Sequence, residues 1–229
     1  MLASATDLGR TWHPDVAPVS CGSIMPDKTE SRRIDSVEAL EEALSAPPVS
    51  VVEALGRLEG DILFLGAGGK IGGSLAAMAR RAADAAGGSR RILAVSRFSQ
   101  APEEAKLRRW GVETLRCDLL DEEALRRLPD APNVVFLAGF KFGASEQPSS
   151  TWAINTYLPS LVCRRYPASR IAAFSTGTLY GLAQVNGGGS RESDPPHPVG
   201  EYAASCLGRE RLFEYFSQRN RTPVALIRL

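Results

Sequence analysis

One glycine-rich turn constrains this chain more than any other segment: Gly66-Ala67-Gly68-Gly69-Lys70-Ile71-Gly72. It joins an apolar strand pattern at 62–65 to a helical pattern that begins at its last glycine. In a G-x-x-G-x-x-G turn, the first glycine permits a tight turn, the second lets backbone approach a phosphate, and the third lets the helix pack on the strand. The helix N-terminus then offers free N–H groups and a positive dipole end to an anion. We therefore predict a dinucleotide site with its pyrophosphate on Gly66, Gly69, Lys70, Ile71 and Gly72, and an ordinary turn is the alternative.

Strand and helix patterns alternate from residue 61 onward. Strands are expected at 62–65, 91–96, 112–116, 133–138, 170–175 and 223–228, with helices at 72–86, 103–110, 121–128, 151–165 and 202–219. Several of these strands are nearly continuous apolar runs, which is typical of strands buried on both faces of a parallel sheet. The pattern predicts a three-layer α/β/α Rossmann fold with a mainly parallel, doubly wound sheet in the order 3-2-1-4-5-6.

Three regions are expected along the chain. Residues 1–30 show no periodicity and carry several prolines, so we predict a disordered or loosely attached segment. Residues 31–60 predict two helices that cover an edge or face of the sheet: Ser36 opens the first, Pro47-Pro48 ends it, and the second runs to about residue 58. Residues 61–229 form the dinucleotide-binding domain. Because the sequence stops inside a strand pattern, we expect a domain truncated at its sixth strand, with its C-terminal substrate region missing and a tendency to be unstable or to form a homodimer.

The composition limits the classes of partner. The 229 residues are 44% hydrophobic with a formal net charge of +1, which is ordinary for a soluble globular protein and gives no electrostatic case for nucleic acid or a membrane surface. No apolar run approaches the roughly 20 residues of a membrane span, and no signal peptide is evident. The four widely spaced cysteines indicate reduced thiols in a cytoplasmic protein, and the two distant histidines give little basis for a metal site.

Further motifs follow the glycine turn: Cys117-Asp118-Leu119-Leu120, Phe136-Leu137-Ala138-Gly139, and Phe174-Ser175-Thr176-Gly177-Thr178-Leu179-Tyr180-Gly181. Their order resembles the extended short-chain dehydrogenase/reductase superfamily, specifically its NAD-dependent epimerase/dehydratase family, typified by UDP-galactose 4-epimerase. The resemblance covers roughly residues 61–229. It implies further cofactor-binding residues: Asp118 and Leu119 near the adenine, Ala138 and Gly139 at the fourth strand, Lys141 at the cofactor phosphate, and Asn155, a structural asparagine on the next helix.

The resemblance also implies a catalytic pair, Thr176 and Tyr202. The family's Y-x-x-x-K motif falls on Tyr202-Ala203-Ala204-Ser205-Cys206, so the tyrosine is present and a cysteine stands at the position of the lysine. In the family, the tyrosine transfers a proton, the serine or threonine holds the substrate hydroxyl, and the lysine binds the ribose and lowers the pKa of the tyrosine. Because an unperturbed tyrosine titrates near pH ~10, a fixed cation is needed to make it a useful base near neutrality.

Three interpretations of Cys206 stay open. In the first, another cation takes the place of the lysine, with Arg209 two turns beyond Tyr202 as the candidate, although Arg209 and Arg211 by default indicate a solvated helix face. Alternatively, the enzyme is slow and specialised, with Tyr202 acting mainly as a hydrogen-bond donor. In the third interpretation, the fold binds a dinucleotide but catalyses no reaction with it.

The second strand ends at Ser96-Arg97, where a site that prefers NAD has an acidic residue. A small donor followed by a guanidinium suits the 2′-phosphate of NADP, because an arginine binds phosphate through charge-assisted hydrogen bonds. We therefore predict NADP as the cofactor, with NAD as the alternative if Arg97 only stacks on the adenine.

The predicted function is that of an NAD(P)-dependent oxidoreductase, epimerase or dehydratase. It would act on a hydroxyl or ketone carbon of a small molecule, a sugar or sugar nucleotide. These reactions share their first step, so the sequence does not separate them. The alternative is a catalytically weak or inactive dinucleotide-binding protein with a regulatory or scaffolding role.

Overall fold

Six parallel strands form the centre of the part of the chain that the computed structural model describes, residues 34–99 and 101–229. They are β1 (Ile62–Leu65), β2 (Ile92–Ser96), β3 (Glu113–Arg116), β4 (Asn133–Phe136), β5 (Arg170–Ser175) and β6 (Val224–Arg228). Their order is β3-β2-β1-β4-β5-β6, which confirms the predicted topology. The expectation for residues 1–30 lies outside the described residues.

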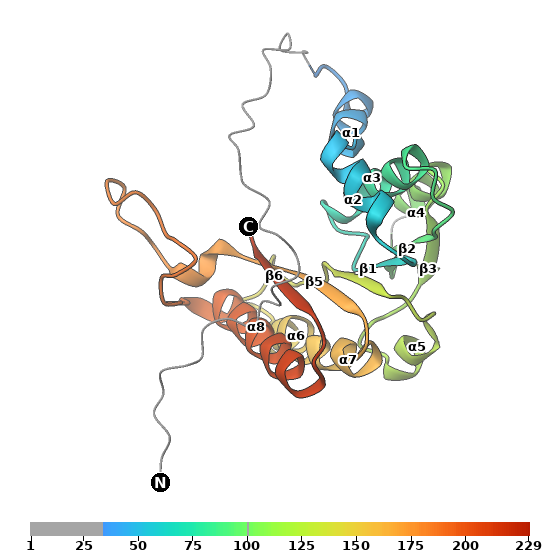
Figure 1. Cartoon of the computed structure of the whole chain (residues 1–229). Helices are drawn as coiled ribbons and strands as arrows, with labels where there is room; N and C mark the ends of the chain where they lie inside the picture. Colours follow the sequence, from blue (N-terminus) through green and yellow to red (C-terminus); the bar gives the residue numbers. More distant parts are fainter. Residues whose placement is uncertain (1–33, 100) are drawn as a thin grey trace. The chain divides into compact units, whose positions relative to one another are not determined.

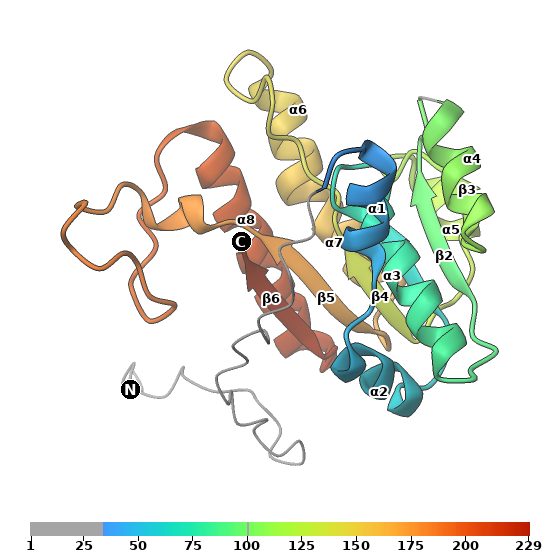
Figure 2. The ribbon, with the colours of Figure 1, turned by 90° about the horizontal axis from the view of Figure 1, so that it is seen from above.

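The register aligns the ends of the central strands. Leu65, the last residue of β1, pairs with Val95 of β2 on one side and with Phe136 of β4 on the other. Parallel strands that end together present their C-terminal ends at one edge of the sheet, which is where ligands bind in open α/β sheets. In Figure 2 the arrowheads of the strands, the loop before α6 and the start of α8 lie at this edge.

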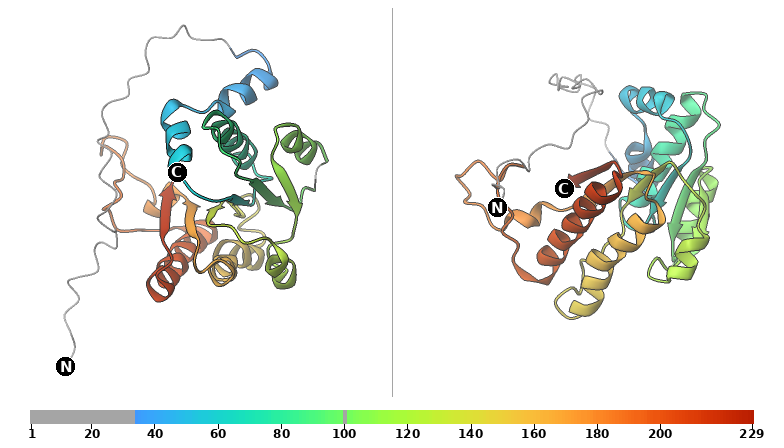
Figure 3. Two further views of the ribbon diagram at one scale, coloured as in Figure 1. Left: turned by 45° about the vertical axis from the view of Figure 1, so that its right-hand side comes forward. Right: turned by 60° about the horizontal axis from the view of Figure 1, so that its bottom comes forward.

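Helices cover both faces of the sheet, as predicted (Figures 1 and 3). On one face, α3 (Gly72–Ala85) and α4 (Ala101–Arg109) pack over Ile62 and Phe64. On the other, α5 (Glu122–Arg127), α7 (Leu158–Arg165) and α8 (Gly200–Asn220) pack over Leu63 and Leu65. All four residues of β1 are buried, because alternate side chains enter the two cores. The three-layer α/β/α prediction is confirmed.

Two short helices precede the sheet. The first, α1 (Val37–Ser45), begins where the Ser36 side chain accepts a hydrogen bond from the Ala39 amide at 3.0 Å, as the sequence predicts. The second is α2 (Val49–Arg57). Most of their contacts are with α3, and Leu55 of α2 also packs against the core on the Ile62 and Phe64 face of the sheet. Arg81 of α3 holds α1 through a 2.6 Å ion pair with Glu42.

The segment expected to be one helix at 151–165 is interrupted. It consists of α6 (Pro148–Trp152), the π-helical turn η1 (Ala153–Tyr157) and α7. A π-turn admits an extra residue and shifts the side chains that follow, and such turns are frequent at functional sites. After β5 come the 3₁₀ turn η2 (Gly177–Tyr180) and a loop at 182–199 without helix or strand, which projects outward in Figure 2. Every described helix is too short or too polar to cross a membrane.

Candidate active site at the C-terminal edge of the sheet

Two glycines of the turn are required by the fold itself. Gly66 has a φ of +91°, and a methyl group on it would stand 2.5 Å from the amide nitrogen of Ala138. A methyl group on Gly72 would stand 2.5 Å from the carbonyl oxygen of Ala67. Because neither residue has a side chain, the chain can turn sharply after β1 against the end of β4, and α3 can start directly after the turn.

Gly69 differs, because the fold leaves room for a side chain there. It is exposed, and a methyl group on it would only reach the Gly66 carbonyl oxygen at 3.7 Å, an ordinary contact. The first turn of α3 next to it has no side-chain cap and no acidic residue. A bare backbone facing an uncapped helix N-terminus fits an external phosphate group. Lys70 and Ile71 are exposed beside it, and the Lys70 ammonium lies 5.8 Å from the Phe142 ring.

Ser96 ends β2 and Arg97 follows it, as predicted, and the nearby carboxylate of Glu103, which sequence reasoning missed, belongs to α4. Ser96 is half-buried and Arg97 is exposed. The chain then turns at Phe98, which is buried with a φ of +45°, a conformation that non-glycine residues rarely adopt. Gly68 faces this strand end: a methyl group on it would collide with Ser96 Oγ and would stand 3.6 Å from Oε2 of Glu103.

Asp118 and Leu119 follow β3 at the same edge. The Asp118 side chain is exposed, and its Oδ1 accepts a hydrogen bond from the Leu120 amide at 3.1 Å. The Leu119 side chain is buried in the core beneath α5 and α7. Only Asp118 therefore offers a side chain to a ligand, and Leu119 can contribute main-chain groups.

Asn155 ties together three elements at this edge. It lies in η1 and is fully buried. Its Nδ2 donates to the Phe140 carbonyl at 2.9 Å and to Ser205 Oγ at 3.0 Å, and its Oδ1 accepts from the Phe140 amide at 2.8 Å. The loop after β4, with half-buried Ala138 and exposed Gly139, is thereby held against α8. Asn155 thus supports the site from beneath.

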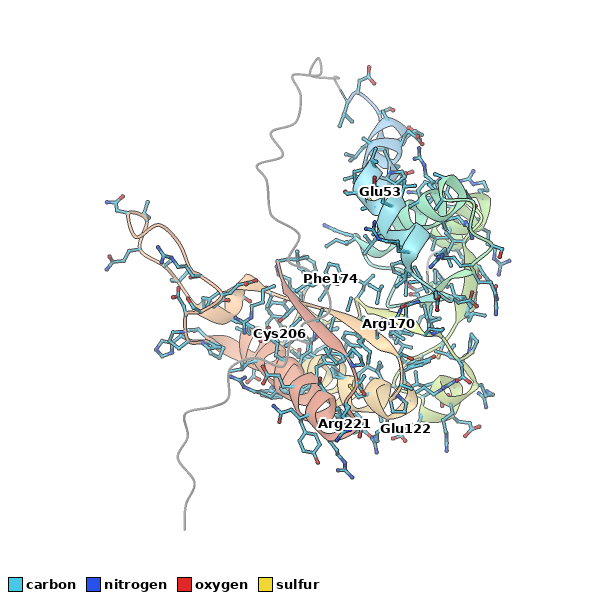
Figure 4. The ribbon with its side chains drawn as sticks, in the orientation of Figure 1. Glu53, Glu122, Arg170, Phe174, Cys206 and Arg221 are labelled. Carbon is cyan, nitrogen blue, oxygen red and sulfur yellow. The ribbon has the colours of Figure 1, made fainter. Side chains whose placement is uncertain are left out.

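Arg209 is buried, which corrects the default expectation of a solvated helix face. Its guanidinium donates to the carbonyl of Phe174 on β5 and to Asn155 Oδ1, each at 2.8 Å, and lies 5.5 Å from the Phe136 ring. Figure 4 labels Phe174 on β5, the strand to which Arg209 of α8 donates. A methyl group on Gly139 would stand 3.0 Å from Nη2 of Arg209. Helix α8 therefore places a fixed positive charge directly below the end of β4. Arg211 is exposed, as expected.

The predicted catalytic residues, Thr176 and Tyr202, lie near each other and near Arg209. Thr176 is buried at the end of β5, where its Oγ1 accepts from the Thr178 amide at 3.3 Å. Half-buried Tyr202 lies in the first turn of α8. Burial raises the pKa of Tyr202 and Cys206 adds to the increase, whereas the Thr176 hydroxyl and the charge of Arg209 are near enough to lower it.

Lys141 approaches the same tyrosine from the loop after β4. Its ammonium lies 5.6 Å from the centre of the Tyr202 ring, whereas the resemblance implied a contact with the cofactor phosphate. The thiol of Cys206, fully buried one turn along α8 and labelled in Figure 4, has a pKa raised by burial. Two cations, Arg209 and Lys141, thus lie near the tyrosine, although the Y-x-x-x-K lysine is absent.

Two participants were missed by sequence reasoning. Glu103 could have been found from the acidic pair that opens the helix after β2, which is the one signal it leaves in the sequence. Ser205 leaves no signal, because its partners, Asn155 at 3.0 Å and the Tyr202 carbonyl at 2.8 Å, are fixed only by the packing of α8 on η1.

The parallel sheet, the glycine turn and the residues at the strand ends define a Rossmann-type α/β domain. The family described as "NAD dependent epimerase/dehydratase family" matches residues 62–229. The chain therefore belongs to the NAD-dependent epimerase/dehydratase family. A comparison with curated proteins finds no match.

Solved structures with a similar fold include three sugar-nucleotide epimerases. UDP-glucuronic acid 4-epimerase from Bacillus cereus, in complex with NAD, is 18% identical with a TM-score of 0.59, covering 73% of this chain and 56% of its own. The UDP-Glc/GlcNAc 4-epimerase from Campylobacter jejuni is 21% identical with a TM-score of 0.62, covering 74% and 53%. UDP-glucose 4-epimerase from Brucella ovis, in complex with NAD, is 17% identical with a TM-score of 0.60, covering 74% and 51%. The chain thus spans about half the length of these proteins.

Proposed function

We propose that residues 61–229 form the dinucleotide-binding domain of an NAD(P)-dependent enzyme that acts on a hydroxyl or ketone carbon of a sugar nucleotide. The observation that carries this proposal is the placement of Thr176 and Tyr202, from β5 and α8, at the edge of the sheet that also holds the glycine turn. Ligands of open α/β sheets bind across this edge. The UDP-sugar names of the similar structures support a sugar nucleotide as the substrate class.

The glycine turn with Lys70 and Ile71 would hold the pyrophosphate, Asp118 the adenine end, and Gly139 and Lys141 the part near the tyrosine. When bound, a nicotinamide dinucleotide supplies a hydride acceptor for alcohol oxidation. Ser96 and Arg97 support the predicted preference for NADP, and Glu103 opposes it.

Thr176 would orient the substrate hydroxyl and Tyr202 would accept its proton. For Tyr202 to act as a base near neutrality, its raised pKa has to be lowered when substrate binds. Arg209 supplies a permanent charge from below, and Lys141 supplies a second from the ring face. This arrangement supports the interpretation in which other cations replace the missing lysine.

Turnover of the purified protein with UDP-glucose and UDP-glucuronic acid, each with NAD and with NADP, tests the proposal. Tyr202→Phe should lower turnover at least about a hundredfold. Tyr215→Phe, which alters an exposed tyrosine farther along the same helix, serves as the matched control. Equal activity of Tyr202→Phe and the native protein would contradict the assignment of Tyr202.

A second function, dinucleotide binding without catalysis, is favoured by the fully buried Cys206 at the lysine position. Under that alternative, calorimetry would detect a bound dinucleotide, and no sugar nucleotide would be converted under any of the four conditions. Conversion of any of the substrates would exclude it.

A further inference from the structure

The carboxylate of Glu103 lies in the corner of the site formed by the glycine turn and the end of β2. Oε2 of Glu103 would lie 3.6 Å from a methyl group on Gly68, and the hydroxyl of Ser96 lies still closer to the same point. Glu103 belongs to the first turn of α4, where the helix dipole stabilises a negative charge. Its carboxylate and the Ser96 hydroxyl therefore face the same residue of the turn.

The neighbouring acid, Glu104, has a different role. It is buried and accepts hydrogen bonds from Arg108 at 2.7 Å, from Arg116 at 2.7 Å and from Thr114 at 3.0 Å. These bonds fix α4 against β3. Arg108 and Arg116 form ion pairs with this carboxylate.

The position of Glu103 matters because the adenosine ribose of a dinucleotide lies between the glycine turn and the end of β2. The two cofactors differ there in one group. NAD has a 2′-hydroxyl, which donates a hydrogen bond to a carboxylate, whereas NADP has a 2′-phosphate, which a carboxylate repels. Sites that prefer NAD take this carboxylate from the end of the second strand, where this chain has Ser96.

We propose that Glu103, reaching over from α4, supplies the carboxylate that β2 lacks and makes the site selective for NAD over NADP. The proposal rests on the proposed dinucleotide site and reverses the preference read from Ser96 and Arg97. Arg97 is exposed and follows Ser96, so it is the opposing determinant. Glu103 is thus a specificity-determining residue supplied by a helix rather than by the strand.

Isothermal titration calorimetry of the native protein with NAD and with NADP tests this directly, without turnover. The native protein should bind NAD at least about tenfold more tightly than NADP, because like charges face each other in the NADP complex. Glu103→Gln should reduce that ratio about tenfold or more by raising the affinity for NADP. Glu113→Gln is the matched control. It removes the same charge at the first residue of β3, at the edge of the sheet away from the proposed dinucleotide site, where Glu113 pairs with Arg91 at 2.7 Å. The ratio of NAD to NADP affinity should be unchanged in this variant.

Tighter binding of NADP than of NAD by the native protein would overturn the inference, and a loss of NADP affinity in Arg97→Ala would then identify Arg97 as the dominant group. An unchanged ratio in Glu103→Gln would overturn it as well. Failure of the native protein to bind either dinucleotide would instead contradict the proposed function, so the two failures are distinguishable.

Discussion

Replacing Arg209 with methionine should strongly destabilise the protein, because Arg209 joins three elements from a buried position. Arg209 is 5% exposed, and its guanidinium donates to the Phe174 carbonyl and to Asn155 Oδ1, each at 2.8 Å, with a weaker bond to the Asn155 carbonyl at 3.3 Å. A methionine side chain fills much of the same space but has no hydrogen-bond donor.

The magnitude follows from the two short bonds. A hydrogen bond made by a charged group contributes about 1.5–3 kcal/mol, and Asn155 Oδ1 keeps its second bond from the Phe140 amide when Arg209 is replaced. Loss of the two Arg209 bonds therefore lowers the free energy of unfolding by about 3–6 kcal/mol, partly offset because the buried charge is also removed. For a domain of this size each kcal/mol corresponds to about 2–4 °C in the unfolding midpoint. We expect a net loss of about 3 kcal/mol and a decrease of roughly 6–12 °C.

Urea unfolding followed by circular dichroism, together with calorimetric melting, measures both quantities. Arg211→Met is the control: Arg211 lies on the same helix, has a side chain that is 56% exposed and pairs only with Glu214 at 2.7 Å. It should change stability by less than about 0.5 kcal/mol. A loss below about 1 kcal/mol for Arg209→Met, similar to that of the control, would refute the account of Arg209 as a buried support of the site.

Three further changes probe the site. Gly72→Ala should destabilise the protein by at least about 2 kcal/mol in urea unfolding, because its methyl group meets the Ala67 carbonyl at 2.5 Å, whereas Gly73→Ala has open space and should be tolerated; equal effects would contradict the packing described here. Lys141→Met should move the rise of kcat with pH to higher pH, because loss of the cation above the Tyr202 ring disfavours the phenolate; an unmoved profile would remove Lys141 from this role. The pKa of Glu104 is held below its ordinary value of 4.5, chiefly by Arg116, so its charged form favours the folded state and its contribution is lost as pH falls below that value. The decrease in melting temperature from pH 7 to pH 4 should therefore be smaller in Glu104→Gln, and an identical decrease would contradict this.

The sequence predicted the fold closely because the signals that determine it are local. Apolar runs such as 62–65 are long enough to identify buried strands, and the glycine turn fixes the first strand-to-helix crossover. The order of the six strands was predicted as that of the Rossmann fold, one of the arrangements that right-handed crossovers permit. The interruption of the helix at 153–157 was not predicted, because the one extra residue of a π-turn shifts the hydrophobic periodicity too little to distinguish the segment from a continuous helix.

The candidate site was predictable only where its residues follow strand ends or glycines. The environment of Arg209 was not, since a charged residue on a helix is solvated by default and only the packing of α8 on β5 and η1 buries it. Glu103 was missed for a similar reason: its sequence position assigns it to the start of a helix, and its approach to Gly68 depends on the way the chain turns at Phe98.

The central claim, that the glycine turn is a phosphate-binding cradle, is tested most directly by calorimetric titration of Gly69→Ala with NAD and NADP. The fold has room for this methyl group, which only reaches the Gly66 carbonyl at 3.7 Å, so the unfolding midpoint should stay close to the native value. Dinucleotide affinity should decrease at least about tenfold, because the methyl group occupies the approach of the pyrophosphate. Gly56→Ala makes an equal 3.7 Å contact in α2, with Ala86, and should bind as the native protein does. Native affinity in a folded Gly69→Ala protein would contradict the claim.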